Sequence, residues 1–268
     1  MSRIYDNIEL RFENGLQGML SNAGVKRADF CVGYFNLRGW RLICETVDRL
    51  PGDYLYEGDD RIFRTCRLLI GMQRPPDELV QRLYTCFERH ELPDSEDVKR
   101  CRRQIGTEFR NQLVCGVPSS KDEWALRRLS AQLKQGKVTV KLHLREPLHA
   151  KLYLAHRPED HFNPIQSIMG SSNLTYSGLT KQGELNAEFG DRDDGQKFSK
   201  WFDARWEDRF SIDISEDLAR IIDESWAGEQ GPTPYEVYLR IIYHLSREAR
   251  NGMTEYNLPA AFERDLFD

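Results

Sequence analysis

The chain has 268 residues, of which 40% are hydrophobic and 30% are charged, and its formal net charge at pH 7 is −5. This composition is ordinary for a globular protein with a real core, and no stretch approaches the 18 consecutive apolar residues of a membrane-spanning helix. The first ten residues lack the apolar segment of a secretory signal, so we expect a cytoplasmic protein with no membrane partner. The net negative charge does not attract nucleic acid to the molecule as a whole, so binding of nucleic acid would need a local basic cleft.

Strands and helices alternate in the first third of the chain. Residues 28–35 and 66–72 have the apolar composition of buried strands. Residues 38–47 and 74–90 follow them with the apolar spacing of helices, and the second of these begins with prolines and acidic residues. This order of elements favours an α/β sheet.

The middle of the chain adds helices and then more strands. Residues from about 94 to 137 are highly charged and mostly helical in pattern, and a further helix is predicted at 215–226. Strands are predicted at 137–144, 148–154, 164–172 and 184–189. We therefore predict an α/β fold, a mixed sheet flanked by helices, with a charged helical insertion at about 94–137 and a C-terminal helical extension. The corresponding domains are residues 1–212 and residues 213–268.

The cysteines are not spaced to bind a metal ion. They include no C-x-x-C pair and no matching pair of histidines, which argues against a zinc site and against a dense disulfide scaffold. We expect no cofactor and no metal. The six cysteines are Cys31, Cys44, Cys66, Cys86, Cys101 and Cys115.

A histidine and a lysine stand two residues apart in one predicted strand. Side chains alternate across a strand, so His149, Lys151 and Tyr153 point to one face, while the leucines around them point to the other. Taken alone, this pair is typical of an amphipathic strand with a solvated polar face. The segments that follow change this interpretation.

Further polar groups end or begin the next predicted strands. Ser171 and Asn173 lie at the end of the strand predicted at 164–172, and Asn186 and Glu188 lie in the strand predicted at 184–189. Adjacent strands would bring these groups close to His149. Histidine can act as a nucleophile or general acid, while ammonium and amide groups donate hydrogen bonds to anionic oxygens. This combination suits attack on a phosphodiester without a metal.

Three short motifs carry a resemblance to a known family. They are His149-Ala-Lys151, Gly170-Ser171-Ser172-Asn173 and Asn186-Ala-Glu188. Their order, H-x-K, G-S-x-N and N-x-E, resembles the phospholipase D superfamily, also called the HKD family. The run "GSSNLTYSGL" resembles the nuclease-like branch more than the lipid-hydrolysing branch.

The resemblance implies a metal-independent phosphodiesterase that acts through a phosphohistidine. His149 would be the nucleophile, Lys151 and Asn173 would hold the non-bridging oxygens with help from Ser171, and Glu188 would orient the imidazole. Glu184 is the alternative carboxylate, because its spacing is nearer that of the smallest family members.

The chain departs from the family pattern at two points. The aspartate expected five residues after the lysine is replaced by His156, a position that is usually structural and is often missing in nuclease-like members. The chain also has a single H-x-K motif, whereas family enzymes combine two in one active site. We therefore expect a homodimer.

The resemblance also suggests a larger context and leaves alternatives open. Related domains stand at the N-terminus of superfamily 2 helicases in restriction and phage-defence systems, and the C-terminal extension resembles the start of such a helicase module. The expected substrate is nucleic acid, DNA ahead of RNA. A lipid phosphodiesterase and a non-catalytic module for nucleic-acid binding or dimerisation are the alternatives.

Overall fold

The computed structural model describes residues 3–57, 60–73, 75–88, 95–114 and 118–228, together with 238, 241–243 and 245–246. The chain divides into two compact units, Met1–Glu229 and Gln230–Asp268. Most of the predicted C-terminal extension beyond residue 228 lies outside the described residues.

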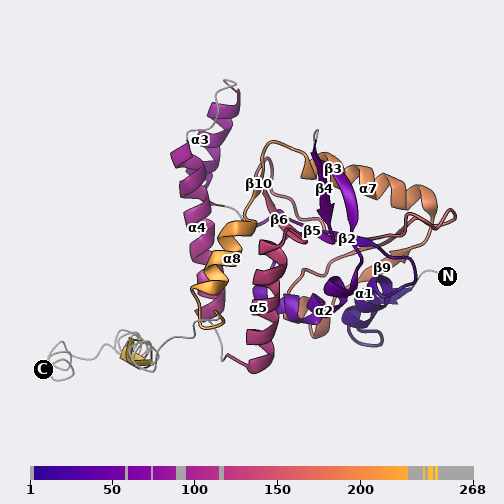
Figure 1. Cartoon of the computed structure of the whole chain (residues 1–268), viewed down its shortest axis with the longest axis horizontal. Helices are drawn as coiled ribbons and strands as arrows, with labels where there is room; N and C mark the ends of the chain where they lie inside the picture. The colour runs from indigo at the N-terminus through magenta and orange to yellow at the C-terminus, as the bar shows by residue number, and fades with distance from the viewer. Residues whose placement is uncertain are drawn as a thin grey trace, which may run out of the picture. The chain divides into compact units, whose positions relative to one another are not determined.

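A mixed eight-stranded sheet forms the centre of the first unit (Figure 1). The three strands β2, β5 and β6 run parallel, and their neighbours on either side are antiparallel. A separate hairpin is formed by β3 (Asp53–Glu57) and β4 (Asp60–Arg64). The main sheet has the order β1 (Ile4–Tyr5), β9 (Asn186–Phe189), β8 (Ile165–Gly170), β7 (Leu152–His156), β2 (Arg27–Val32), β5 (Cys66–Ile70), β6 (Val138–His143) and β10 (Ser211–Asp213).

Helices cover both faces of this sheet. Strands alternate their side chains, so β2 sends Phe30 to one face and Cys31 to the other. The larger core lies beneath α1 (Phe12–Leu20), η1 (Leu37–Leu42), α2 (Cys44–Arg49), α4 (Ser95–Val114), α5 (Ser120–Lys134) and α8 (Ser215–Asp223). The smaller core lies beneath α7 (Arg192–Trp206). Two further helices are α3 (Asp77–Glu88) and α6 (Tyr176–Thr180). The predicted mixed sheet flanked by helices is confirmed.

The predicted helical insertion consists of α4 and α5. In α4 the residues Ile105, Phe109 and Leu113 are buried, and α5 buries Leu126 and Leu129 in the same core. Their spacing of three or four residues gives each helix one apolar face that packs into the core.

Helix α8 also packs within the first unit. Its residues Leu218, Ile221 and Ile222 belong to the larger core, and Arg110 of α4 donates a hydrogen bond to Glu224 just after the helix. The domain boundary predicted between residues 212 and 213 stays a prediction, and the first compact unit extends beyond it, through Glu229.

Strand β7 is buried on both faces, so neither of its faces is solvated. The strand begins at Leu152, so His149 and Lys151 precede it. Tyr153 packs against Phe12 and Phe30 on one face, and Leu154 belongs to the core beneath α7. The neighbours β2 and β8 place this strand inside the sheet, where helices cover both sides.

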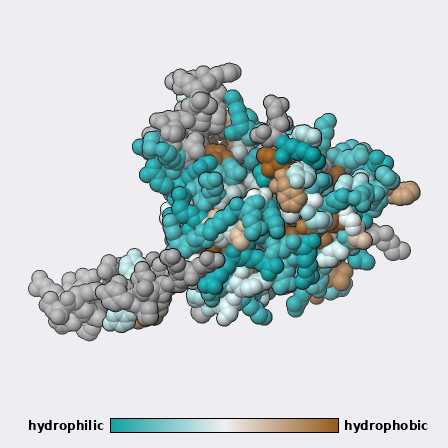
Figure 2. All heavy atoms as spheres, in the orientation of Figure 1, coloured by the Kyte–Doolittle hydropathy of each residue, from teal (hydrophilic) through white to brown (hydrophobic). Residues whose placement is uncertain are grey.

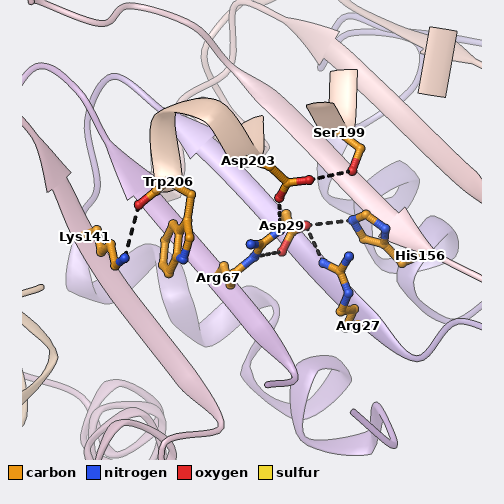
Figure 3. A network of polar contacts seen from close by, with 8 residues as sticks. All are labelled: Arg27, Asp29, Arg67, Lys141, His156, Ser199, Asp203 and Trp206. Carbon is orange, nitrogen blue, oxygen red and sulfur yellow. Dashed lines mark hydrogen bonds and ion pairs between the residues drawn. The ribbon is translucent and has the colours of Figure 1, made fainter. Parts of the chain in front are cut away.

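A buried cluster of charges connects α7 to the sheet (Figure 3). Arg67 donates from Nε and Nη2 to the carboxylate of Asp29 at 2.7 Å each, and from Nη2 to Asp203 of α7 at 2.7 Å. Arg27 also pairs with Asp29, and His156 Nε2 lies 2.7 Å from its Oδ2. Burial alone would raise the pKa of Asp29, but Arg67, Arg27 and His156 hold it well below its usual range. Asp29 therefore stays charged and fixes α7 over β2 and β5.

Among the described residues, no helix is both long and apolar enough to cross a membrane. The face of the molecule in Figure 2 is covered mainly by hydrophilic residues, with small hydrophobic patches between them.

Candidate active site

The sheet topology brings the ends of four strands to one edge. Cys31 of β2 pairs with Leu152 of β7, so the chain leaving β2 meets the chain entering β7. Leu152 pairs with Met169 of β8, and Gly170 pairs with Asn186 at the start of β9. The H-x-K and G-S-x-N segments therefore lie side by side at this edge, as the sequence predicted.

His149 and Asn173 meet over Gly33, the residue that follows β2. A Cβ atom at position 33 would lie 3.1 Å from His149 Cδ2 and 3.2 Å from both Asn173 Oδ1 and Met72 Cγ. Any larger residue would force these neighbours to move, so glycine leaves the room in which the two side chains meet. Asn173 Oδ1 accepts a hydrogen bond from the Tyr34 backbone N–H at 2.9 Å, which orients the amide and leaves its NH₂ group to donate.

Lys151 lies against the imidazole of His149. Its Nζ is 2.7 Å from Nε2, 2.9 Å from Nδ1 and 3.0 Å from the His149 carbonyl oxygen. An ammonium group only donates hydrogen bonds, so these contacts require a ring nitrogen that accepts. Lys151 is 4% exposed, whereas His149 is exposed at the edge of the sheet. Burial lowers the pKa of Lys151, and the negative charge of Glu184 partly offsets this effect.

Glu184 is the carboxylate that reaches this group of residues. Its Oε2 accepts a hydrogen bond from Ser171 Oγ, and Ser171 Oγ in turn accepts from the Leu185 backbone N–H at 2.9 Å. The hydroxyl of Ser171 is therefore directed to Glu184.

Glu188 lies elsewhere, which corrects the expectation that it stands behind His149. One carboxylate oxygen accepts from Gln166 Nε2, and the other is 3.4 Å from the Tyr5 hydroxyl. Glu188 pairs with Ile168 in the middle of β8. Each strand residue advances the chain by about 3.3 Å, so Glu188 lies well inside the sheet while the site is at its edge.

Asn186 of the same motif has a structural position. It is fully buried, its Nδ2 donates to Ser172 Oγ at 2.8 Å, and its Oδ1 accepts from the Ser172 backbone N–H at 3.2 Å. The Tyr153 hydroxyl donates to the Ser172 carbonyl at 2.8 Å. These contacts hold the turn that presents Ser171 and Asn173.

Sequence reasoning missed the parts played by Gly33, Ser172 and Tyr153. Ser172 occupies the variable position of G-S-x-N, and Tyr153 looked like one more residue of the polar face. A glycine directly after a buried strand, as in Val32-Gly33, was the available signal for a close approach at that point.

The site offers donors and cations rather than a set of metal ligands. In the part of the chain that the structure describes, no three His, Cys, Asp or Glu side chains are grouped to hold a metal ion. The imidazole can attack a phosphorus atom, and Lys151 and Asn173 can donate to the oxygens that carry the developing charge.

Comparison with known proteins gives a family match over residues 92–206, to the PLD-like domain of cardiolipin synthase. No curated protein sequence matches the chain. Among solved structures, the chain is similar to Nuc from Salmonella typhimurium, a phospholipase D family member, with 10% identity, a TM-score of 0.42, and coverage of 80% of this chain and 97% of that one.

Two other solved structures show weaker likeness. NucT from Helicobacter pylori has 9% identity, a TM-score of 0.41, and coverage of 79% and 98%. TrmBL2, an archaeal chromatin protein, has 10% identity, a TM-score of 0.33, and coverage of 79% and 54%. The family match contains His149-Ala-Lys151, Gly170-Ser171-Ser172-Asn173 and Glu184, so over residues 92–206 the chain is similar to the PLD-like domain.

Proposed function

We propose that this protein hydrolyses phosphodiester bonds of nucleic acid, DNA ahead of RNA, through a phosphohistidine and without a metal. The observation that carries the proposal is the convergence of His149, Lys151 and Asn173 at one edge of the sheet. It unites an exposed nucleophile, a buried ammonium and an oriented amide, which are the groups that would attack and hold a phosphate.

The chemistry proceeds in two displacements. A ring nitrogen of His149 attacks phosphorus, the bond to the leaving oxygen breaks, and a proton passes to that oxygen from a second His149. This second imidazole then takes a proton from water, and the hydroxide displaces His149 from phosphorus. The products are a hydroxyl end, a phosphomonoester end and the regenerated imidazole.

Lys151 and Asn173 stabilise the charge that develops on the non-bridging oxygens. Lys151 contacts the imidazole in the free protein and can donate to a phosphate bound at the same position. The Asn173 amide is already oriented by Tyr34 N–H, so little reorganisation accompanies the reaction.

We assign the supporting carboxylate to Glu184 in place of Glu188. Glu184 fixes the hydroxyl of Ser171 and favours the protonated state of Lys151. Glu188 contacts Tyr5 and Gln166 and reaches no group of the site.

The second His149 would come from a second copy of the chain. The sequence has one H-x-K motif, and a two-fold axis near His149 would place two imidazoles on opposite sides of one phosphate. The links to a helicase module and to a restriction or phage-defence system, together with a cytoplasmic location, remain part of this proposal.

Incubation of labelled single- and double-stranded DNA and RNA with EDTA tests the function. We expect cleavage by the wild type and none by His149→Ala, because that change removes the nucleophile. His161→Ala is the matched control, since His161 is an exposed histidine on the loop between β7 and β8.

Each other outcome points to a different function. Cleavage retained in His149→Ala would refute the active site, and cleavage that requires added Mg²⁺ would refute the metal-independent mechanism. A gel shift without cleavage would favour the binding module, and hydrolysis of phospholipid vesicles alone would favour the lipid phosphodiesterase.

A further inference from the structure

A cavity of about 600 Å³ opens directly beside His149 and Lys151, on the face of the sheet that α7 covers. Its volume lies within the usual range for small-molecule sites. The sheet contributes Ala150, Leu152, Met169 and Gly170, and α7 contributes Phe198 and Trp201. The proposed chemistry uses none of these side chains.

The two walls of this cavity differ in shape. The α7 wall carries two aromatic rings, of which Phe198 packs edge-on against Phe189 with the ring centroids 5.5 Å apart. In the opposite wall, the small Ala150 lies beside the longer aliphatic side chains Leu152 and Met169. An apolar slot between aromatic and aliphatic side chains fits a flat ring.

The aromatic wall is held in place before any ligand binds. The Arg205 guanidinium lies 3.9 Å from the centroid of the Trp201 ring, and its Nη1 donates to the Trp201 carbonyl. Two residues further along the helix than Trp201, Asp203 anchors α7 to Arg67 of the sheet (Figure 3). A ligand therefore meets a preorganised surface, and binding orders little further structure.

Positive charge flanks the cavity on two sides. Lys151 lies at its catalytic end, and Lys197 lies on α7, where it forms an exposed ion pair with Asp193 at 2.5 Å. Exposed pairs of this kind contribute little stability, so the Lys197 ammonium is available to a phosphate. The cavity thus combines an apolar slot with cations at its rim, which matches a planar base attached to a phosphate backbone.

We propose that this cavity binds the nucleobase next to the scissile phosphate by stacking it on Trp201, and that the substrate is therefore single-stranded nucleic acid. A base within a duplex is stacked and paired, so it enters the slot only after unpairing. The proposal rests on the proposed function for the placement of the phosphate, and it adds the substrate class.

Binding measurements test the cavity independently of catalysis. In a His149→Ala background, the affinity for a 12-residue oligothymidylate is compared with that for an abasic strand of equal length and charge. Trp201→Ala should weaken binding of the intact strand about 10-fold or more and leave the abasic strand unchanged. Trp201→Phe should recover most of the loss, and Trp201→Leu should not.

Trp124→Ala is the matched control. Trp124 is 43% exposed on α5, and Arg128 lies over its ring, as Arg205 does over Trp201. It should bind both strands like its His149→Ala parent. Duplex DNA of the same length should bind more weakly than the single strand, and Trp201→Ala should reduce that difference.

Four results would overturn the inference. The first is equal affinity of Trp201→Ala and its parent for the intact strand, and the second is an equal loss of affinity for the intact and the abasic strand. The third is a Trp201-dependent affinity for phosphatidylglycerol vesicles that exceeds the affinity for the oligonucleotide. The fourth is loss of a dimer in Trp201→Ala. The first two leave the proposed function standing. Cleavage by the catalytic His149→Ala variant would refute that function without altering the binding result.

Discussion

Glu184 and Glu188 lie four residues apart and face different parts of the molecule. Glu184 precedes β9 and reaches Ser171 at the edge of the sheet that carries His149, while Glu188 lies within β9 and faces Tyr5 and Gln166. This pair allows one residue to act as the control for the other, because both are glutamates on the same segment.

Glu184→Gln should lower turnover about 10-fold or more, whereas Glu188→Gln should leave turnover close to that of the wild type. Gln keeps the shape of the side chain and removes the charge that supports Lys151 and accepts from Ser171. Steady-state cleavage rates of both variants decide the matter. A larger loss in Glu188→Gln would return the carboxylate role to Glu188.

The two glutamate variants should also differ in how their activity depends on pH. Lys151 must be protonated to hold a phosphate oxygen, so activity should fall as the pH rises through the pKa of Lys151. Burial lowers this pKa and Glu184 raises it, so Glu184→Gln should lower it further and move the alkaline limb of the pH–rate profile to lower pH. An unshifted limb would show that Glu184 does not act through Lys151. The profile of Glu188→Gln should match the wild type.

Removal of the ammonium itself should have a larger effect. We expect Lys151→Ala to lower the rate of cleavage about 100- to 1000-fold, as is usual when a group that stabilises a transition state is lost. Thermal unfolding of the variant checks that it is folded, since Lys151 is buried. Near-normal turnover would place Lys151 outside the chemistry.

At the scale of the elements, the cluster around Asp29 joins three strands and a helix. His156 occupies the position where the family pattern has an aspartate, and the carboxylate at this place comes instead from Asp29 on the neighbouring strand β2, with His156 Nε2 2.7 Å away. The sheet thus still has a buried acid beside β7, supplied by a different residue.

Asp29→Asn should destabilise the fold by about 3–5 kcal/mol, because the buried Arg27 would lose its charged partner and the buried Arg67 would keep only Asp203. Asp203→Asn is the comparison, since its side chain is 41% exposed and water can replace part of the lost contact. Urea unfolding of both variants measures the difference. Equal losses of unfolding free energy in the two variants would mean that burial does not determine how much an ion pair contributes to stability.

His156 gives the cluster a dependence on pH. Burial lowers the pKa of His156, and Asp29 only partly offsets this effect. Below the ordinary histidine pKa of about 6.5 the unfolded chain therefore binds more protons than the folded chain, and stability falls as the pH decreases toward the folded pKa. His156→Gln should show a flatter decline than the wild type in urea unfolding from pH 7.5 to 5. Identical slopes would exclude His156 as the source, and the exposed His161→Gln should behave as the wild type.

At the scale of the whole molecule, the site has one nucleophile at an open edge of the sheet. The proposed reaction needs a second imidazole opposite the first, and a two-fold axis supplies it with one gene product. In this proposal the dimer is therefore part of the mechanism.

Co-expression of wild type with His149→Ala should give heterodimers that lack one of the two imidazoles. If these are inactive, an equal mixture should keep about one quarter of the activity, below the half expected of independent monomers. Light scattering on the same samples measures the assembly. Activity that follows the wild-type fraction linearly, or a monomer that cleaves, would contradict the dimeric site.

The sequence alone determined the mixed α/β sheet and the motifs that meet at its edge. Strand and helix periods are local properties, so Cys66–Ile70, Ile165–Gly170 and the helices of the insertion could be predicted from short windows. The proximity of His149 to Asn173 followed from the expected pairing of neighbouring strands, together with the family resemblance.

Only the tertiary structure decided which carboxylate reaches the site and what surrounds it. Glu184 and Glu188 are four residues apart, so their spacing alone does not show which of them reaches the site. The register of β9 against β8 decides this, and it is set by contacts between residues far apart in sequence, such as Gly170 with Asn186. The cavity beside His149 likewise depends on α7, whose position is fixed by Arg67 and Asp203, 136 residues apart. Contacts of this range leave no local pattern, because they arise from packing across the sheet and not from the period of any one segment.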